Sequence, residues 1–373
     1  MSSNGQLSQA QILAAYNARF LFARYGTRRI PGPAFKYGST WSANTNSDPI
    51  RVTTGNFLAG VKARIHGTMA YTLPAGSAAP TLTSTGAQGL IRNLAVIGQN
   101  QVTPVSLSGQ AQEIFHVLEQ KADYQDTAVF GLPAANAGTA SVTVNESVDV
   151  WQQYDLVQDY VDLLGIQNVN NDSLNIDVQM NFGAETDCVS LPAGATATFT
   201  GVVDLYAVRF RANKAGQPGP DFTKFFNQLA IVRGQKMDSQ SVVININFKQ
   251  LITRIILLVS TAANTLDSEN SLGISSVSLT ASSGELILGN WDLQDIINEQ
   301  AKRYGPEFTA NWGGKGLYAL DFDLIREYID GSAYTNLALT LEMPTTPAAG
   351  ATVSAYLQGI TNTFPQVPVF MVG

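Results

Sequence analysis

Two short acidic segments hold the side chains whose types and spacing are best suited to bind a metal ion or to catalyse a reaction. In each segment three carboxylates stand at positions i, i+4 and i+7, namely Asp155, Asp159 and Asp162, and Asp323, Glu327 and Asp330. On a helix this spacing places each set on one face, where carboxylates bind Ca²⁺ or act as paired acids in glycosidases. The opposite face is apolar, as is typical of a solvated surface helix. We favour the surface helix, because a duplicated active site is unusual.

The remaining candidate side chains stand apart from one another. His66 falls on an expected strand and His116 on an expected helix, with no Cys or His at ligand spacing near either. Cys188 lies in a turn-like run, residues 183–192, and lacks a nucleophile signature. As the single cysteine it excludes an internal disulfide, and we expect it to be a free thiol. These residues predict no metal, no cofactor and no catalytic site.

One feature supports an enzyme. Asp321 and Asp323 are two positions apart on an expected strand, so they share a face as a pair of hydrolytic acids would. Against this, residues 312–316 lack the spacing of a phosphate loop, and the chain has no G-x-S-x-G motif. A glycan-acting hydrolase that uses Asp321, Asp323 or Glu327 is therefore an alternative to a protein that is not an enzyme.

The N-terminal arm is basic. Residues 1–47 contain no Asp or Glu, although the whole chain has a net charge of −7. The basic side chains of the arm are Arg19, Arg24, Arg28, Arg29 and Lys36. Such an arm suits phosphate groups of lipid or nucleic acid. Interleaved aromatic residues for base stacking are missing, so we favour a membrane-facing or solvated arm over sequence-specific nucleic-acid binding.

The composition favours β-sheets with a covered surface. Of 373 residues, 45% are hydrophobic and 14% are charged, whereas roughly a quarter of an average soluble domain is charged. A chain of this length predicts two domains. No secretory signal is visible, and the longest apolar stretch, 251–263, is too short to span a bilayer. We expect a product made in the cytoplasm.

Period-two alternation predicts strands along most of the chain. The expected strands of a first unit are 50–54, 58–73, 90–97, 140–151, 174–182 and 196–210. Those of a second unit are 242–248, 251–260, 277–288, 316–322, 337–343 and 351–360. Helices are expected at 7–25, 107–121 and 291–304, the last capped by Asn290 and ended by Gly305.

A cluster of Gly and Pro between residues 211 and 221 predicts a linker between the two units. The expected organisation is an N-terminal helix and basic arm at 1–48, a first unit at 49–212, a linker at 213–236 and a second unit at 237–373.

An internal repeat indicates that the second unit is a copy of the first. The segment YDLVQDYVD at 154–162 returns as FDLIREYID at 322–330, with identical residues at four of nine positions. Both copies follow an expected strand and precede an alternating strand that ends in Met. Matched Ala-Gly-Ala-Thr turns at 193–196 and 349–352 then open the last strand of each unit. Preserved order and spacing predict duplication of a whole unit.

Three stretches resemble a known family. Residues 90–97 and the helix expected after them are similar to a strand and helix in the double jelly-roll major capsid proteins of tectiviruses and related tailless, internal-membrane phages. The segment Lys315-Gly316-Leu317-Tyr318 is similar to that family's Lys-Gly-apolar-Tyr strand, and the Ala/Gln-rich N-terminal helix has a counterpart. The order of elements resembles the family over nearly the whole chain.

The resemblance implies an all-β protein with a few flanking helices, built from two tandem eight-stranded jelly rolls. It also implies a structural coat protein of the virion, whose homotrimers have a pseudo-hexagonal outline and tile an icosahedral shell. Its partners would be neighbouring trimers, minor coat or penton proteins and an internal lipid membrane near the basic arm. The duplicated acidic helices would lie at the outer surface or between subunits.

Two rival functions stay open at this point. One is the double jelly-roll hydrolase described above, and the other is a viral spike that binds a glycan or a receptor.

Overall fold

The computed structural model describes residues 27–29, 37–52, 57–83, 85–97, 105–109, 111–112, 129–156, 167–168, 176–212, 225–247, 251–262, 265–267, 270–281, 284, 286–305, 316–322, 329–331, 333–334 and 336–362. The expected N-terminal helix at 7–25 lies outside these residues. So does most of the helix expected at 107–121, of which Gly109, Ala111 and Gln112 are helical.

The chain forms two compact units that divide between Asn227 and Gln228. This division falls inside the stretch that the sequence predicted as a linker, 213–236. The linker prediction is wrong in its second half, because residues Phe225–Lys236 form strand β14. The preceding Gly and Pro cluster led to the error, since it masked the start of an extended segment.

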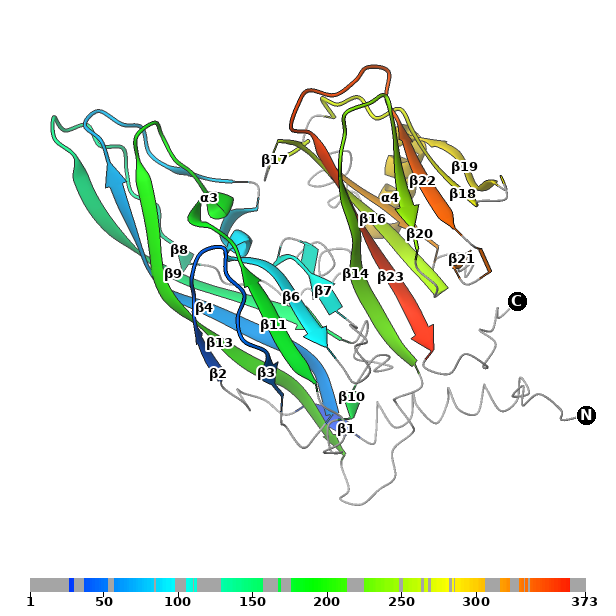
Figure 1. Cartoon of the computed structure of the whole chain (residues 1–373), viewed down its shortest axis with the longest axis horizontal. Coiled ribbons are helices and arrows are strands. Elements are labelled where there is room, and N and C mark those ends of the chain that lie inside the picture. Colours follow the sequence, from blue (N-terminus) through cyan, green and yellow to red (C-terminus); the bar gives the residue numbers. More distant parts are fainter. Residues whose placement is uncertain are drawn as a thin grey trace, which may run out of the picture. The chain divides into compact units, whose positions relative to one another are not determined.

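The first unit contains two main sheets (Figure 1). One has the strand order β2-β13-β4-β9 and the other the order β3-β11-β6-β7. The bounds of these strands are β2 (Tyr37–Thr40), β3 (Ile50–Arg51), β4 (Phe57–Leu73), β6 (Ile91–Ile97), β7 (Val105–Leu107), β9 (Val142–Asp155), β11 (Asp177–Phe182) and β13 (Thr196–Ala212).

Smaller elements complete the first unit. Strand β1 pairs with β13, β8 with β9, β10 with β4, and β5 with β12. Their bounds are β1 (Thr27–Arg29), β5 (Thr81–Leu82), β8 (Val129–Phe130), β10 (Gln167–Asn168) and β12 (Val189–Ser190), and the short helices are η2 (Gly86–Leu90) and α3 (Glu185–Cys188).

The second unit also has two sheets, with the strand orders β14-β23-β16-β20 and β15-β22-β18-β19. The bounds are β15 (Ser241–Ile246), β16 (Leu251–Ala262), β18 (Ser276–Ala281), β19 (Leu286–Asp292), β20 (Leu317–Asp321), β22 (Leu337–Glu342) and β23 (Thr352–Asn362). Two short strands, β17 (Thr265–Leu266) and β21 (Ile329–Asp330), pair with β16, and helix α4 (Leu293–Tyr304) follows β19.

The two units share one topology. Numbered from the first to the eighth main strand of each unit, one sheet has the order 1-8-3-6 and the other 2-7-4-5. This interleaved antiparallel arrangement is the eight-stranded jelly roll. The prediction of two tandem jelly rolls is therefore confirmed. The repeated nonapeptide begins in the last residues of the sixth strand in the first unit and directly after the sixth strand in the second unit.

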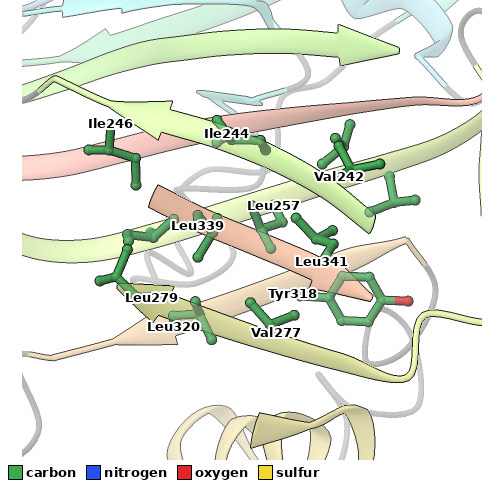
Figure 2. Close-up of a cluster of buried hydrophobic side chains, with 14 of the residues drawn as sticks. Val242, Ile244, Ile246, Leu257, Val277, Leu279, Tyr318, Leu320, Leu339 and Leu341 are labelled. Atoms are coloured by element: carbon green, nitrogen blue, oxygen red, sulfur yellow. The ribbon is translucent and has the colours of Figure 1, made fainter. Parts of the chain in front are cut away.

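Apolar and polar side chains alternate along the strands because each strand buries one face in the core. Strand β15 alternates between exposed residues and the buried Val242, Ile244 and Ile246. Figure 2 shows Ile244 together with buried side chains of the other strands, such as Leu257 and Leu339. Each fully buried Leu or Ile contributes roughly 1.5–3 kcal/mol, so each unit is stabilised by a core of its own.

Two local predictions are wrong. The single strand expected at 277–288 is a hairpin of β18 and β19, with Gly284 at a φ of 79° between them. Helix α4 is capped by Asp292, whose side chain accepts a hydrogen bond from the backbone N–H of Asp295, whereas the expected cap, Asn290, lies in β19. Gly305 ends the helix as expected.

Candidate functional site

A buried charged cluster joins helix α4 to strands β16 and β20. Asp321 is the last residue of β20 and lies opposite Arg254 of β16. One carboxylate oxygen of Asp321, Oδ2, accepts hydrogen bonds from Arg254 Nε at 2.7 Å and from Tyr304 Oη at 2.6 Å. The other oxygen, Oδ1, pairs with the guanidinium of Arg303.

The environment of Asp321 is that of a structural ion pair. Its side chain is 5% exposed, and that of Arg254 is 4% exposed. Burial raises the pKa of Tyr304 above its ordinary value, so the phenol stays a hydrogen-bond donor to the carboxylate at neutral pH. With both oxygens engaged by cations and a hydroxyl, Asp321 fixes α4 to the sheet. This arrangement disfavours its use as a hydrolytic acid.

A cavity of about 310 Å³ lies beside this cluster. It is lined by Ala319 and Asp321 of β20 and by residues on or next to α4: Trp291, Asp295, Asn298, Glu299, Gln300, Lys302, Arg303 and Tyr304. The lining combines an aromatic ring with carboxylates and amides, which is the chemistry that binds hydroxyl-rich ligands.

The outward face of the first unit carries an aromatic and cationic surface. The ring of Trp151 in β9 stacks on Tyr206 of β13, with centroids 5.5 Å apart and an angle of 22° between the planes. Lys62 Nζ lies 4.8 Å and Arg64 Cζ lies 5.0 Å from the centroid of the Trp151 ring. We call Lys62, Arg64, Trp151 and Tyr206 the aromatic platform.

Strand register builds the platform. Lys62 in β4 stands opposite Tyr206 in β13, and Arg64 stands opposite Trp151 in β9. Neighbouring odd-numbered residues of β4, such as Ala63, are buried in the core. Because side chains alternate along a strand, the cations must point outward over the aromatic rings.

One ion pair and one histidine–carboxylate contact lie along the platform. Arg64 donates to both oxygens of Asp149, at 2.8 Å and 2.6 Å, and these hydrogen bonds hold the pKa of Asp149 below its ordinary value. His66 Nε2 lies 3.1 Å from Asp204 Oδ2. The histidine that the sequence left without a partner thus has a carboxylate neighbour from a strand 138 residues away in the chain.

The predicted acidic helices are only partly described. Asp155 is the last residue of β9, is 2% exposed and accepts a hydrogen bond from Gln153. Asp330 lies in β21, opposite Leu251. The structure therefore places these two residues on strands and not on a solvated helix face. Strand β9 extends further than expected into the first repeat, and the short strand β21 forms the end of the second repeat. Asp159, Asp162, Asp323 and Glu327 lie outside the described residues.

The predicted basic arm is described at two of its five cations. Arg28 and Arg29 lie in β1, which pairs with the end of β13. Arg19, Arg24 and Lys36 lie outside the described residues, as does His116. Strands β1 and β2 both fall within residues 1–48, the segment for which the sequence predicted an N-terminal helix and a basic arm.

Cys188 is buried at the end of α3. Burial raises the pKa of its thiol above the ordinary value. Among the described residues, no three His, Cys, Asp or Glu side chains form a metal-binding group, and no helix there is long and apolar enough to span a membrane.

Comparisons with known proteins identify the architecture. No protein-family model matches the chain, and no curated protein matches it either. The major capsid protein of Sulfolobus turreted icosahedral virus is similar in structure, with 14% identity, a TM-score of 0.56 and coverage of 91% of this chain and 97% of that one. The Faustovirus major capsid protein has 9% identity, a TM-score of 0.57 and coverage of 90% and 91%. The chain therefore has the double jelly-roll fold of these viral major capsid proteins.

Proposed function

We propose that this chain is the major capsid protein of an icosahedral virus and resides in the virion. The observation that carries the proposal is the pair of jelly rolls with one topology in a single chain, matched over about nine-tenths of its length by capsid proteins. The proposed mechanism is assembly, in which the repeated surfaces of one chain contact further copies of the same chain.

The proposed building block is a homotrimer. Three copies of two similar units place six jelly rolls around a threefold axis, and six similar bodies approximate a hexagon that can tile a shell. This gives a physical reason for the duplicated unit. The neighbouring trimers and any minor coat or penton proteins would then contact the rims of the hexagon.

The proposed inner partner is a lipid membrane. Residues 1–47 contain five basic side chains and no acidic ones, and each Lys or Arg near an anionic surface contributes about 1 kcal/mol of attraction. Arg19, Arg24, Arg28, Arg29 and Lys36 would make this contact. Full-length protein should bind vesicles that contain anionic lipid, and a variant with these five residues changed to Gln should lose that binding.

Light scattering and negative-stain microscopy of the full-length protein test the assembly proposal. We expect particles of about 120 kDa, three times the chain mass of 39.9 kDa, with a hexagonal outline. A stable monomer at micromolar concentration would contradict the proposal.

The cavity beside α4 favours a second candidate function, the binding of a glycan. Trp291 could stack on a sugar ring while Asp295 and Asn298 bond its hydroxyls. A glycan array probed with wild-type protein and with the Trp291→Ala variant tests this function. Sugar binding that is lost in the variant would support it, and the absence of binding on the array would exclude it for the sugars present.

A further inference from the structure

We infer that the aromatic platform of one copy docks on the outward face of the four-stranded sheet β15-β22-β18-β19 of a second copy. This inference rests on the proposed capsid function and names the contact that would hold the trimer together.

The platform has the composition of a protein-binding centre. Trp, Tyr and Arg dominate the binding energy of protein interfaces, above all where they gather at the middle of a surface. Here Trp151, Tyr206 and Arg64 gather at the centre of a sheet, since β4 lies between β9 and β13. Val202, on the same face, is 37% exposed. Lys62, Arg64, Trp151 and Tyr206 are each partly exposed, so aromatic and cationic side chains reach the surface of the described part of the first unit.

One cation of the platform, Lys62, has no acidic partner among the described residues. Arg64 is paired with Asp149, and His66 lies beside Asp204. Lys62 has cation–π contact with Trp151, but no described residue forms an ion pair with it. A partner that brings a carboxylate to Lys62 would complete the charges of the platform.

The second unit presents a face of the opposite character. In β22 the residues Leu337, Leu339 and Leu341 enter the core, so Ala338, Thr340 and Glu342 point outward by alternation. Strand β15 likewise presents Ser241, Val243 and Asn245, and Val243 is 41% exposed. We call these outward residues of β15 and β22 the flat face. Its side chains are short, which leaves room for the bulky rings of the platform.

The flat face supplies the missing charge. Glu342 is exposed and is the only charged residue in the sequences of β15, β18 and β22. Its carboxylate accepts a hydrogen bond from Ser241 Oγ at 2.8 Å, which orients it at the end of the strand. Glu342 is therefore the acidic partner that we assign to Lys62.

A contact between two different faces has a geometric consequence. Because each copy carries both faces, every docking event leaves one platform and one flat face unused. Such a head-to-tail contact forms a closed ring when a whole number of copies, each rotated by the same angle from the last, completes a full turn. Closure after three copies would give the proposed homotrimer.

Charge reversal tests the contact. Sedimentation velocity should be measured on full-length wild type, Lys62→Glu, Glu342→Lys and the double variant that carries both changes. Each single reversal should raise the dissociation constant of the trimer at least about tenfold, and the double variant should recover most of this loss. Lys302→Glu is the matched control, because Lys302 is 69% exposed on α4 and belongs to neither face.

Val243→Arg provides a second test that does not involve the charge pair. The side chain of Val243 is exposed, so the variant should keep the thermal unfolding midpoint of the monomer while a long charged side chain blocks the ring contact. Single reversals and Val243→Arg that all leave the trimer intact would overturn the inference. If these variants still form trimers but no longer assemble into shells, the contact lies between trimers, and this outcome would also overturn the inference. A wild type that stays monomeric would instead contradict the proposed function itself.

Discussion

Asp321 shows how a residue that looks catalytic in sequence can serve packing. Its carboxylate neutralises Arg254, which is 4% exposed, and accepts a hydrogen bond from the hydroxyl of Tyr304. An uncompensated buried charge costs about 3–5 kcal/mol. We therefore expect Asp321→Asn, which keeps the volume but removes the charge, to lower the free energy of unfolding of the second unit by that amount. Urea denaturation of the full chain measures it.

The control for this prediction is Asp177→Asn. Asp177 pairs with Arg51 at 3.2 Å, but the two side chains are 30% and 56% exposed. Exposed pairs contribute about 0–1 kcal/mol, so this variant should unfold almost like the wild type. Equal effects of the two substitutions would show that burial of the Asp321 cluster does not determine its contribution.

Cys188 should be inert in the folded protein. The thiolate is the reactive form, and burial raises the pKa of Cys188 well above neutral pH. We expect a thiol reagent such as 5,5′-dithiobis(2-nitrobenzoic acid) to label less than a tenth of the native chain at pH 8, and to label the chain fully in guanidinium chloride. Rapid labelling of the native protein would contradict the burial of this side chain.

At the scale of the element, helix α4 depends on its first hydrogen bond. Asp292 Oδ1 accepts from the backbone N–H of Asp295 at 2.8 Å. Loss of such a cap costs about 1 kcal/mol. Asp292→Ala should therefore destabilise the second unit by about 1 kcal/mol in urea denaturation, while Asp292→Asn, which retains the acceptor, should be nearly neutral. Similar losses in both variants would assign the effect to the charge and not to the cap.

The alternation of apolar and polar residues predicted the long strands, because a strand that buries one face needs an apolar residue at every second position. Strand β4 was expected at 58–73 and is observed at Phe57–Leu73, and β22 was expected at 337–343 and is observed at Leu337–Glu342. Strand β7 was missed because its three residues are too few to show a period. The hairpin of β18 and β19 was read as one strand, since apolar residues continue on both sides of the turn.

The candidate sites were less predictable than the strands, because they depend on register between distant segments. Arg254 and Asp321 are 67 residues apart, and Lys62, Trp151 and Tyr206 come from three strands. Spacing within one segment carries no information on such pairs. The one usable signal was the alternation of Lys62, Arg64 and His66 along β4, which places three basic side chains on one face.

At the scale of the whole molecule, assembly and stability should be linked. If copies associate only when folded, association stabilises the folded state by mass action. The thermal midpoint of the wild type should then rise with protein concentration, by roughly 1 °C for each tenfold increase in a chain of this length. Differential scanning calorimetry between micromolar and tenth-millimolar concentrations measures this shift.

The sign of the shift separates assembly from aggregation. Aggregation of unfolded chains lowers the apparent midpoint as the concentration rises, because it removes the unfolded state irreversibly. Assembly of folded chains raises it. The Lys62→Glu variant forms a weaker trimer, so its midpoint should lie below that of the wild type at each concentration at which the wild type is trimeric. A wild type whose midpoint is independent of concentration, or falls, would argue against association of folded chains and hence against the proposed trimer.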